Sequence, residues 1–104
     1  MTVQKVNSLD EYKQLISRSG LIVVDYYATW CGPCNMIGPK IDDLSDKMKD
    51  VSFIKVDVDA HPDIADLESV RAMPTLKLFL NGRETKCIVG ANFDVLHQAI
   101  LSHK

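Results

Sequence analysis

The chain has 104 residues, of which 46% are hydrophobic, and its 12 basic and 14 acidic side chains leave a formal net charge of −2. This near balance, with a predicted isoelectric point of 5.8, gives no reason to expect a nucleic-acid surface, and no apolar run is long enough to span a membrane. The length suits one ordinary domain, so we expect residues 1–104 to form a single domain.

The first part of the chain predicts a strand, a helix and a buried strand. Residues 2–6 suit a short edge strand. Ser8 followed by Glu11 matches a capping box, which predicts a helix that Gly20 ends. The apolar run Leu21-Ile22-Val23-Val24-Asp25-Tyr26-Tyr27 predicts a strand that is buried on both faces.

The middle of the chain predicts two helices and one strand. After Cys34, apolar residues recur at helical spacing, at Ile37, Ile41, Leu44 and Met48. The β-branched run over residues 51–58 predicts a strand. Asp59 is expected to cap a short helix over residues 62–67.

The last third predicts a hairpin and a final helix. Asn81-Gly82 is a strong hairpin signal between strands over residues 75–80 and 84–89, and Asn92 is expected to cap the last helix. The order is then β-α-β-α-β-α-β-β-α. Strands that helices separate pair in parallel, whereas the hairpin forces an antiparallel pair. We therefore expect an α/β fold with a mixed central sheet and helices on both faces.

Two cysteines stand where the buried strand ends and a helix begins. The unpaired N–H groups of a helix N-terminus favour an anion, so Cys31 should lose its proton more easily than a free thiol. Only two residues separate it from Cys34, and closing so short a loop gains roughly 2 kcal/mol of chain entropy. This spacing favours a working disulfide that both opens and closes.

A zinc site is the alternative use of these two thiols. Zinc needs four ligands, and the chain has no second C-x-x-C or H-x-x-x-H pair. His61, His97 and His103 are scattered without ligand spacing. Redox chemistry is therefore favoured, and we expect no metal.

Asp25 is a carboxylate within an otherwise apolar strand. It is either a strand-end residue that reaches solvent or a buried acid whose raised affinity for a proton makes it a base near the thiols. Lys55, in the next strand, is its natural partner if the ammonium reaches inward, and a plain surface lysine otherwise.

Three further residues have two interpretations each. Pro74 begins a strand, where either a cis or a trans peptide bond fits. Trp30 is either ordinary core or, beside an exposed thiol, a flat apolar contact for a partner protein. Cys87 is either an inert strand residue or a site of glutathionylation or intermolecular disulfide formation.

The N-terminal residues lack a signal-peptide core, and three cysteines do not make the disulfide framework of a secreted mini-protein. We therefore expect a soluble cytoplasmic protein in a reducing compartment, with a mature mitochondrial form as the alternative.

The residues around the two cysteines resemble the thioredoxin family. Val24-Asp25-Tyr26 followed by Ala28-Thr29-Trp30-Cys31-Gly32-Pro33-Cys34 is similar to the active-site sequence of that family. The similarity continues in one register at Pro39, Lys55-Val56-Asp57-Val58-Asp59, Met73-Pro74-Thr75, Asn81-Gly82 and Val89-Gly90-Ala91-Asn92. The residues Met73-Pro74-Thr75 and Gly90-Ala91-Asn92 are similar to those of the small eukaryotic thioredoxins.

This resemblance implies a thioredoxin fold and an enzyme that reduces protein disulfides. It implies that Cys31 is the attacking thiolate and Cys34 the resolving thiol. Asp25 would be the buried carboxylate that manages the proton of Cys34, with Lys55 modulating it. Pro74 would be cis and would face the disulfide. A shallow apolar groove for the substrate chain would be lined by Trp30, Gly32, Pro33, Met73, Pro74, Val89, Gly90 and Ala91.

The resemblance also implies the source of electrons and the partners. No cofactor would be bound, and NADPH would recharge the protein through thioredoxin reductase. The substrates would be disulfide-containing client proteins, and we expect a monomer. In this family, a Gly-Pro pair between the two cysteines, as at Gly32-Pro33, is typical of proteins that act as reductants. A glutathione-linked, glutaredoxin-like reductase and a non-enzymatic binding subunit that uses the same groove are the alternatives.

One departure from the family pattern lies beside the second cysteine. Asn35 stands where many thioredoxins carry a basic residue. Its neutral side chain gives less electrostatic support to a thiolate and to acidic partners.

Overall fold

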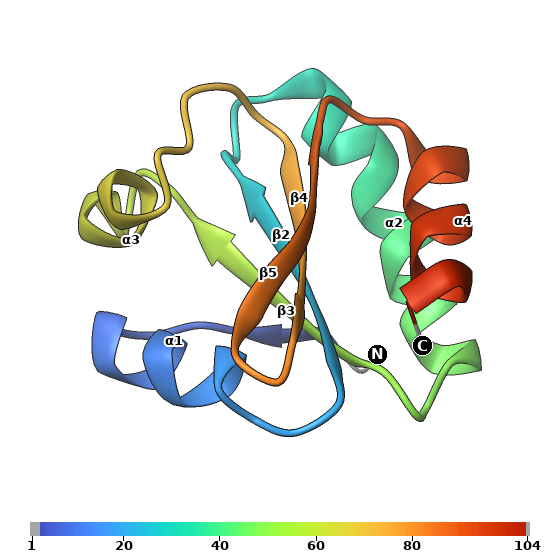
Figure 1. The fold of residues 1–104 in the computed structure, drawn as a ribbon. Coiled ribbons are helices and arrows are strands. Elements are labelled where there is room, and N and C mark those ends of the chain that lie inside the picture. Colours follow the sequence, from blue (N-terminus) through green and yellow to red (C-terminus); the bar gives the residue numbers. More distant parts are fainter. Residues whose placement is uncertain (1–2, 104) are drawn as a thin grey trace.

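A five-stranded mixed sheet forms the centre of the computed structural model, which describes residues 3–103 (Figure 1). The strands are β1 (Val3–Lys5), β2 (Leu21–Tyr27), β3 (Ser52–Asp57), β4 (Thr75–Leu80) and β5 (Arg83–Val89). They lie in the order β1-β3-β2-β4-β5. Strands β1, β3 and β2 run parallel, whereas β4 is antiparallel to β2 and β5 is antiparallel to β4.

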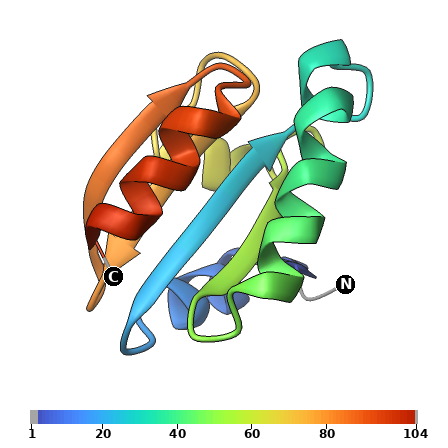
Figure 2. The same cartoon turned by 90° about the vertical axis from the view of Figure 1, so that its right-hand side faces the viewer.

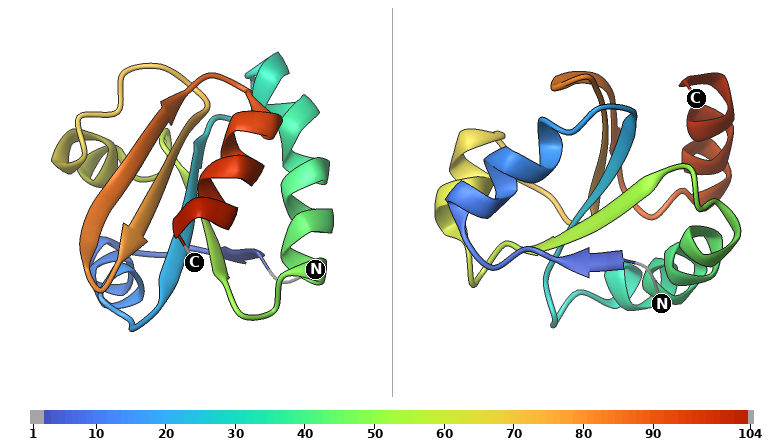
Figure 3. Two further views of the ribbon diagram at one scale, coloured as in Figure 1. Left: turned by 45° about the vertical axis from the view of Figure 1, so that its right-hand side comes forward. Right: turned by 90° about the horizontal axis from the view of Figure 1, so that it is seen from below.

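Helices cover both faces of this sheet. They are α1 (Leu9–Ile16), α2 (Gly32–Lys47), α3 (Pro62–Leu67) and α4 (Phe93–His103). Figure 2 shows α2 and α4 together on one face, and the view from below in Figure 3 shows α1 and α3 on the other. The predicted element order and the mixed sheet with helices on both faces are confirmed.

Local capping and turn signals account for several element boundaries. The hydroxyl of Ser8 accepts the N–H of Glu11 at 3.0 Å at the start of α1. The side chain of Asn92 accepts the N–H of Val95 at 3.2 Å at the start of α4. In the hairpin turn, Asn81 and Gly82 have φ angles of 53° and 84°, and positive φ at both positions matches the twist of the strands.

Three local predictions differ from the structure. Helix α1 ends at Ile16, and Gly20 instead takes a φ of 86° in the turn into β2. The side chain of Glu11 accepts the N–H of Asn7, one residue before the expected partner. The cap position of α3 is His61 and not Asp59. The carboxylate of Asp59 instead accepts a hydrogen bond from the indole of Trp30. The prediction that Thr2 belongs to the first strand is not tested, because Thr2 lies outside the described residues.

Strand β2 is buried on both faces because side chains alternate along it. Leu21 and Val23 pack in the core beneath α2 and α4. Ile22 and Val24 pack in a second core beneath α1 and α3. The predicted two-sided burial of this strand is confirmed, and its carboxyl end lies where α2 begins.

A buried polar network ties α1 to the sheet. The hydroxyl of Tyr26 bonds to that of Tyr12, which donates to the carboxylate of Glu68. The ammonium of Lys77 donates to the backbone carbonyl of Glu68 at 3.0 Å and to the carboxylate of Glu84 at 2.8 Å. Burial raises the pKa of both tyrosines, so both hydroxyls keep their protons at neutral pH.

We expect Tyr12→Phe to lower the free energy of unfolding more than Tyr26→Phe, by about 2 kcal/mol against about 1 kcal/mol. The Tyr12 hydroxyl lies between two partners, whereas removal of the Tyr26 hydroxyl leaves the bond from Tyr12 to Glu68 in place. Urea unfolding of the oxidised variants at neutral pH measures both losses. Equal losses would contradict the central place of Tyr12 in the network.

Candidate functional site

A disulfide between Cys31 and Cys34 lies at the junction of β2 and α2. Cys31 is the N-cap residue of α2, with extended backbone angles, and Gly32 is the first residue of the helix. Pro33 lies in the first turn, where its missing N–H leaves no helical hydrogen bond unmade. The local sequence thus sets the first sulfur just before the helix and the second one within it.

The sulfur of Cys31 lies in a field that favours negative charge. The N–H of Cys34 donates to this sulfur at 3.2 Å, and it is one of the N–H groups that the first turn of a helix leaves unpaired. The partial positive charge of the helix N-terminus acts in the same direction. When the disulfide opens, these two effects stabilise a thiolate at Cys31.

Both sulfur-bearing residues are enclosed in the disulfide form. Cys31 and Cys34 are each 4% exposed, so the prediction of an exposed thiol beside Trp30 is wrong for this form. The carbonyl oxygen of Met73, a residue just before β4, lies 3.5 Å from the Cys31 sulfur. The segment before β4 therefore covers the sulfur from the side.

The segment over the disulfide contains a cis peptide bond between Met73 and Pro74, which decides between the two geometries that the sequence allowed. The hydroxyl of Thr75 donates to the carbonyl of Ala72 at 2.6 Å. The N–H of Gly90 donates to the carbonyl of Pro74 at 2.8 Å, which joins this segment to the end of β5. These contacts join the two segments at the disulfide. Figure 1 shows the loops before α2, β4 and α4 at the top of the molecule.

Exposed apolar side chains stand beside this meeting point. Trp30 is 68% exposed, and its indole N–H donates to the carboxylate of Asp59 at 2.7 Å, which fixes the ring in place. Val89, at the end of β5, is 67% exposed. Of the other residues expected to line a substrate groove, Gly32, Pro33 and Ala91 are exposed, Met73 and Gly90 are half-buried, and Pro74 is buried.

Asp25 lies beneath α2, next to the second cysteine. Its side chain is 6% exposed, and its Oδ1 atom has no hydrogen-bond partner. It lines a cavity of about 250 Å³ together with Cys34 and Lys55. Burial raises the pKa of Asp25 from 3.8 to about 7, against an opposing effect of the Lys55 ammonium. The carboxylate is therefore a base matched to neutral pH.

Lys55 is the register neighbour of Asp25 on β3. Its ammonium lies 5.7 Å from the centre of the Tyr27 ring, a cation–π contact. Among residues 3–103, no salt bridge within 4.0 Å joins it to Asp25. Its charge therefore acts on Asp25 across the cavity and not through a direct ion pair.

The contacts that two aspartates make in this region were not predicted from the sequence. Asp42 lines the cavity of Asp25, and its place eight residues after Cys34, two helical turns on, is a spacing that sequence reasoning can recognise. Asp59 holds Trp30, but no local pattern indicates this contact because it joins residues 29 positions apart. Both depend on how helix and strands pack.

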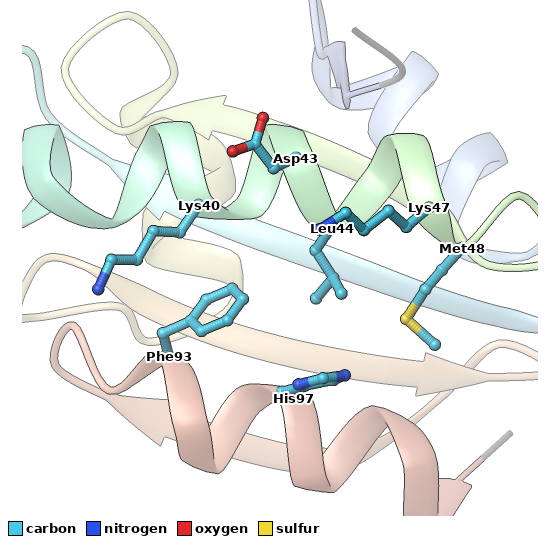
Figure 4. A pocket seen from close by; sticks show the side chains of 7 residues that line it. All are labelled: Lys40, Asp43, Leu44, Lys47, Met48, Phe93 and His97. Carbon is cyan, nitrogen blue, oxygen red and sulfur yellow. The ribbon is translucent and has the colours of Figure 1, made fainter.

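Other candidate features lie apart from the disulfide. Across residues 3–103, His, Cys, Asp and Glu side chains form no group of three or more that could hold a metal ion, and no helix there has the length and apolarity to cross a membrane. Cys87 is an exposed free thiol on β5. A separate groove of about 360 Å³ lies between α2 and α4 (Figure 4).

Comparison with known proteins gives a consistent result. The model of the Thioredoxin family matches residues 3–102. Thioredoxin-1 of Saccharomyces cerevisiae is 45% identical over 101 residues, which cover 97% of this chain and 98% of that protein. The mitochondrial Thioredoxin-3 of the same yeast is 42% identical, over 95% of this chain and 78% of that protein. The crystal structure of Malassezia sympodialis thioredoxin matches with a TM-score of 0.91 at 44% identity, over 97% of this chain and 90% of that one.

We expect Asp25→Asn to stabilise the oxidised protein above about pH 7 and to have little effect below about pH 4. The pKa of Asp25 is about 7 in the folded chain against an ordinary 3.8, so the folded state binds the proton more tightly. Stability therefore falls as the pH rises between these two values. The gain in the free energy of unfolding should level off at about 2 to 4 kcal/mol. The upper end of this range is the free energy that corresponds to the whole pKa shift. Urea unfolding across this range measures it, and a difference independent of pH would contradict it.

We expect Asn35→Lys to lower the pKa of the Cys31 thiol by a few tenths of a pH unit, because a cation near the sulfur favours the thiolate. The amide of Asn35 also donates to the carbonyl of Thr29 at 3.2 Å, so Asn35→Gln, which adds no charge, is the control. Thiolate absorbance is titrated in a background with Cys34→Ser and Cys87→Ser, where Cys31 is the one remaining thiol. Equal titration curves for both variants would reject the electrostatic argument.

Proposed function

Since the chain belongs to the thioredoxin family and is a protein dithiol–disulfide oxidoreductase, we propose that it works as a reductant of client proteins. Electrons come from NADPH through thioredoxin reductase. The observation that carries the proposal is the disulfide at the start of α2, whose first sulfur accepts the N–H of Cys34 at 3.2 Å. The Gly32-Pro33 pair between the cysteines, which goes with reductants in this family, supports the direction of the reaction.

In the first step, the thiolate of Cys31 attacks a disulfide of the client protein. A bond forms between the Cys31 sulfur and one client sulfur, and the other client sulfur leaves as a thiolate. The N–H of Cys34 and the start of α2 favour the attacking thiolate before this step. The product is a mixed disulfide between the protein and its client.

In the second step, the thiol of Cys34 gives its proton to Asp25 and the resulting thiolate attacks Cys31. The disulfide of the protein forms, and the reduced client leaves with its second sulfur as a thiolate. Two electrons have passed to the client. Asp25 suits this role because it lines the same cavity as Cys34 and its pKa of about 7 matches neutral pH. Lys55, across that cavity, moderates its affinity for the proton.

The substrate chain binds across the loops that surround the disulfide. Trp30 and Val89 supply exposed apolar area, and the hydrogen bond from Trp30 to Asp59 holds the ring in advance of binding. Gly32, Pro33 and Ala91 are small residues, so the surface around the Cys31 sulfur is shallow. Gly90 and the Met73-Pro74 segment lie at the edge of this surface. This surface suits an extended peptide segment that carries a disulfide.

The members of this family hold no prosthetic group and act on disulfide-containing targets. We propose that one domain over residues 1–104 carries out the whole reaction as a monomer. Its compartment is the cytoplasm, and its similarity to a mitochondrial relative makes a mature mitochondrial form the alternative.

A coupled assay tests this function. With NADPH, thioredoxin reductase and a disulfide-bonded client protein, the chain should support continuous NADPH oxidation. Cys31→Ser should abolish turnover, because the thiolate that attacks the client is absent. Cys34→Ser should instead accumulate the mixed disulfide with the client, because the resolving thiol is absent. Asp25→Asn should slow turnover by roughly tenfold or more at neutral pH while the mixed disulfide still forms.

The direction of the reaction is tested by the reduction potential of the Cys31–Cys34 pair. Equilibration in defined thiol–disulfide buffers should give a value of about −270 mV, which is the value known for thioredoxin. A value near about −180 mV would instead indicate an isomerase or oxidant. Turnover with glutathione and glutathione reductase alone would favour the glutaredoxin-like alternative. Client binding that survives Cys31→Ser with Cys34→Ser, without any turnover in the native protein, would indicate a binding subunit.

A further inference from the structure

We propose that Asp42 on α2 is a positioning residue for the proton transfer from Cys34 to Asp25, because it lines the same cavity as both of these residues. Two carboxylates and one ammonium would then set the pH range in which Cys34 can be deprotonated. This inference rests on the proposed role of Asp25 as the proton acceptor of Cys34.

One face of α2 forms a wall of the cavity. Cys34, Gly38 and Asp42 follow one another at four-residue intervals, so they lie along the same face of the helix. A Cβ atom added at Gly38 would meet no atom within 4 Å, which shows that the space between Cys34 and Asp42 is open. The carboxylate of Asp42 therefore borders the same open space as the thiol that must lose its proton.

The sheet forms the opposite wall. Asp25 and Tyr27 come from β2, and Lys55 comes from β3. The unpartnered Oδ1 atom of Asp25 receives no hydrogen bond that would disperse its charge. A buried carboxylate responds more strongly than an exposed one to a charge that faces it, because the surrounding protein has a lower dielectric constant than bulk water.

The charged and titratable groups that line the cavity with Asp25 act in opposite directions. Burial is the largest cause of its raised pKa, the Lys55 ammonium lowers the pKa, and the Asp42 carboxylate raises it. Tyr27 holds the Lys55 ammonium at 5.7 Å from its ring, and Cys34 does not titrate in the disulfide form. Asp42 thus offsets part of the effect of Lys55 and makes Asp25 a stronger base near neutral pH.

The test is a titration of the Asp25 side-chain carboxyl carbon by NMR in the oxidised protein, where the active-site thiols are absent. Asp42→Asn should move the midpoint to lower pH by roughly half a unit, because one facing negative charge is lost. Asp42→Glu keeps the charge and should leave the midpoint close to that of the native protein.

Asp43→Asn is the matched control. It removes the same charge from the next residue of α2, but Asp43 is exposed and lines the separate groove toward α4 (Figure 4). We expect its midpoint to equal that of the native protein. Thermal unfolding of the variants at one pH checks that each is folded. If Asp42→Asn and Asp43→Asn give the same midpoint, or if Asp42→Glu shifts it as far as Asp42→Asn does, the proposal is wrong.

The reductase assay separates this inference from the function on which it rests. The acidic limb of the pH profile for client reduction should move to lower pH in Asp42→Asn and stay in place in Asp43→Asn. If the NMR midpoint moves while the activity profile does not, Asp42 does act on Asp25, and the role of Asp25 as proton acceptor is the part that fails.

Discussion

The enclosure of the Asp25 carboxylate beneath α2 is the constraint on which the chemistry of this chain depends. A central strand buried on both faces is the least favourable place for a charge, and one carboxylate oxygen there lacks a hydrogen-bond partner. The fold keeps this group at a cost in stability near neutral pH. Asp25 shares a cavity with Cys34 and Lys55, and the proton transfer that we propose is the chemical use of this costly placement.

Topology explains why the disulfide lies where it does. Because β2 is the middle strand and β4 is antiparallel to it, the carboxyl end of β2 lies beside the loop before β4 and the loop after β5, as well as at the start of α2. The carbonyl oxygen of Met73 lies 3.5 Å from the sulfur of Cys31, and the hydrogen bond from Gly90 to Pro74 joins the two loops there. One end of the sheet therefore combines a favoured thiolate, a base and an exposed apolar surface.

Local sequence features predict much of this structure, since they depend on neighbours only a few residues away. The apolar run of β2, the Asn81-Gly82 turn and the cap at Asn92 each specify their element directly. Asp59 shows where such reasoning fails. A carboxylate shortly before a short helix is typical of a cap, yet its acceptor capacity is used by Trp30, which only the packed fold brings within 2.7 Å.

Local sequence patterns were enough to predict the order of the elements, the mixed sheet and the placement of Cys31 and Cys34 at a helix start, because periodicity, turn residues and spacing are local properties. Tertiary structure decided the cis geometry before Pro74, the enclosure of the sulfurs and the cavity that Asp25 shares with Asp42 and Lys55. These depend on distances between segments far apart in the chain and on how much water the packing excludes, and both are set only when the helices close over the sheet.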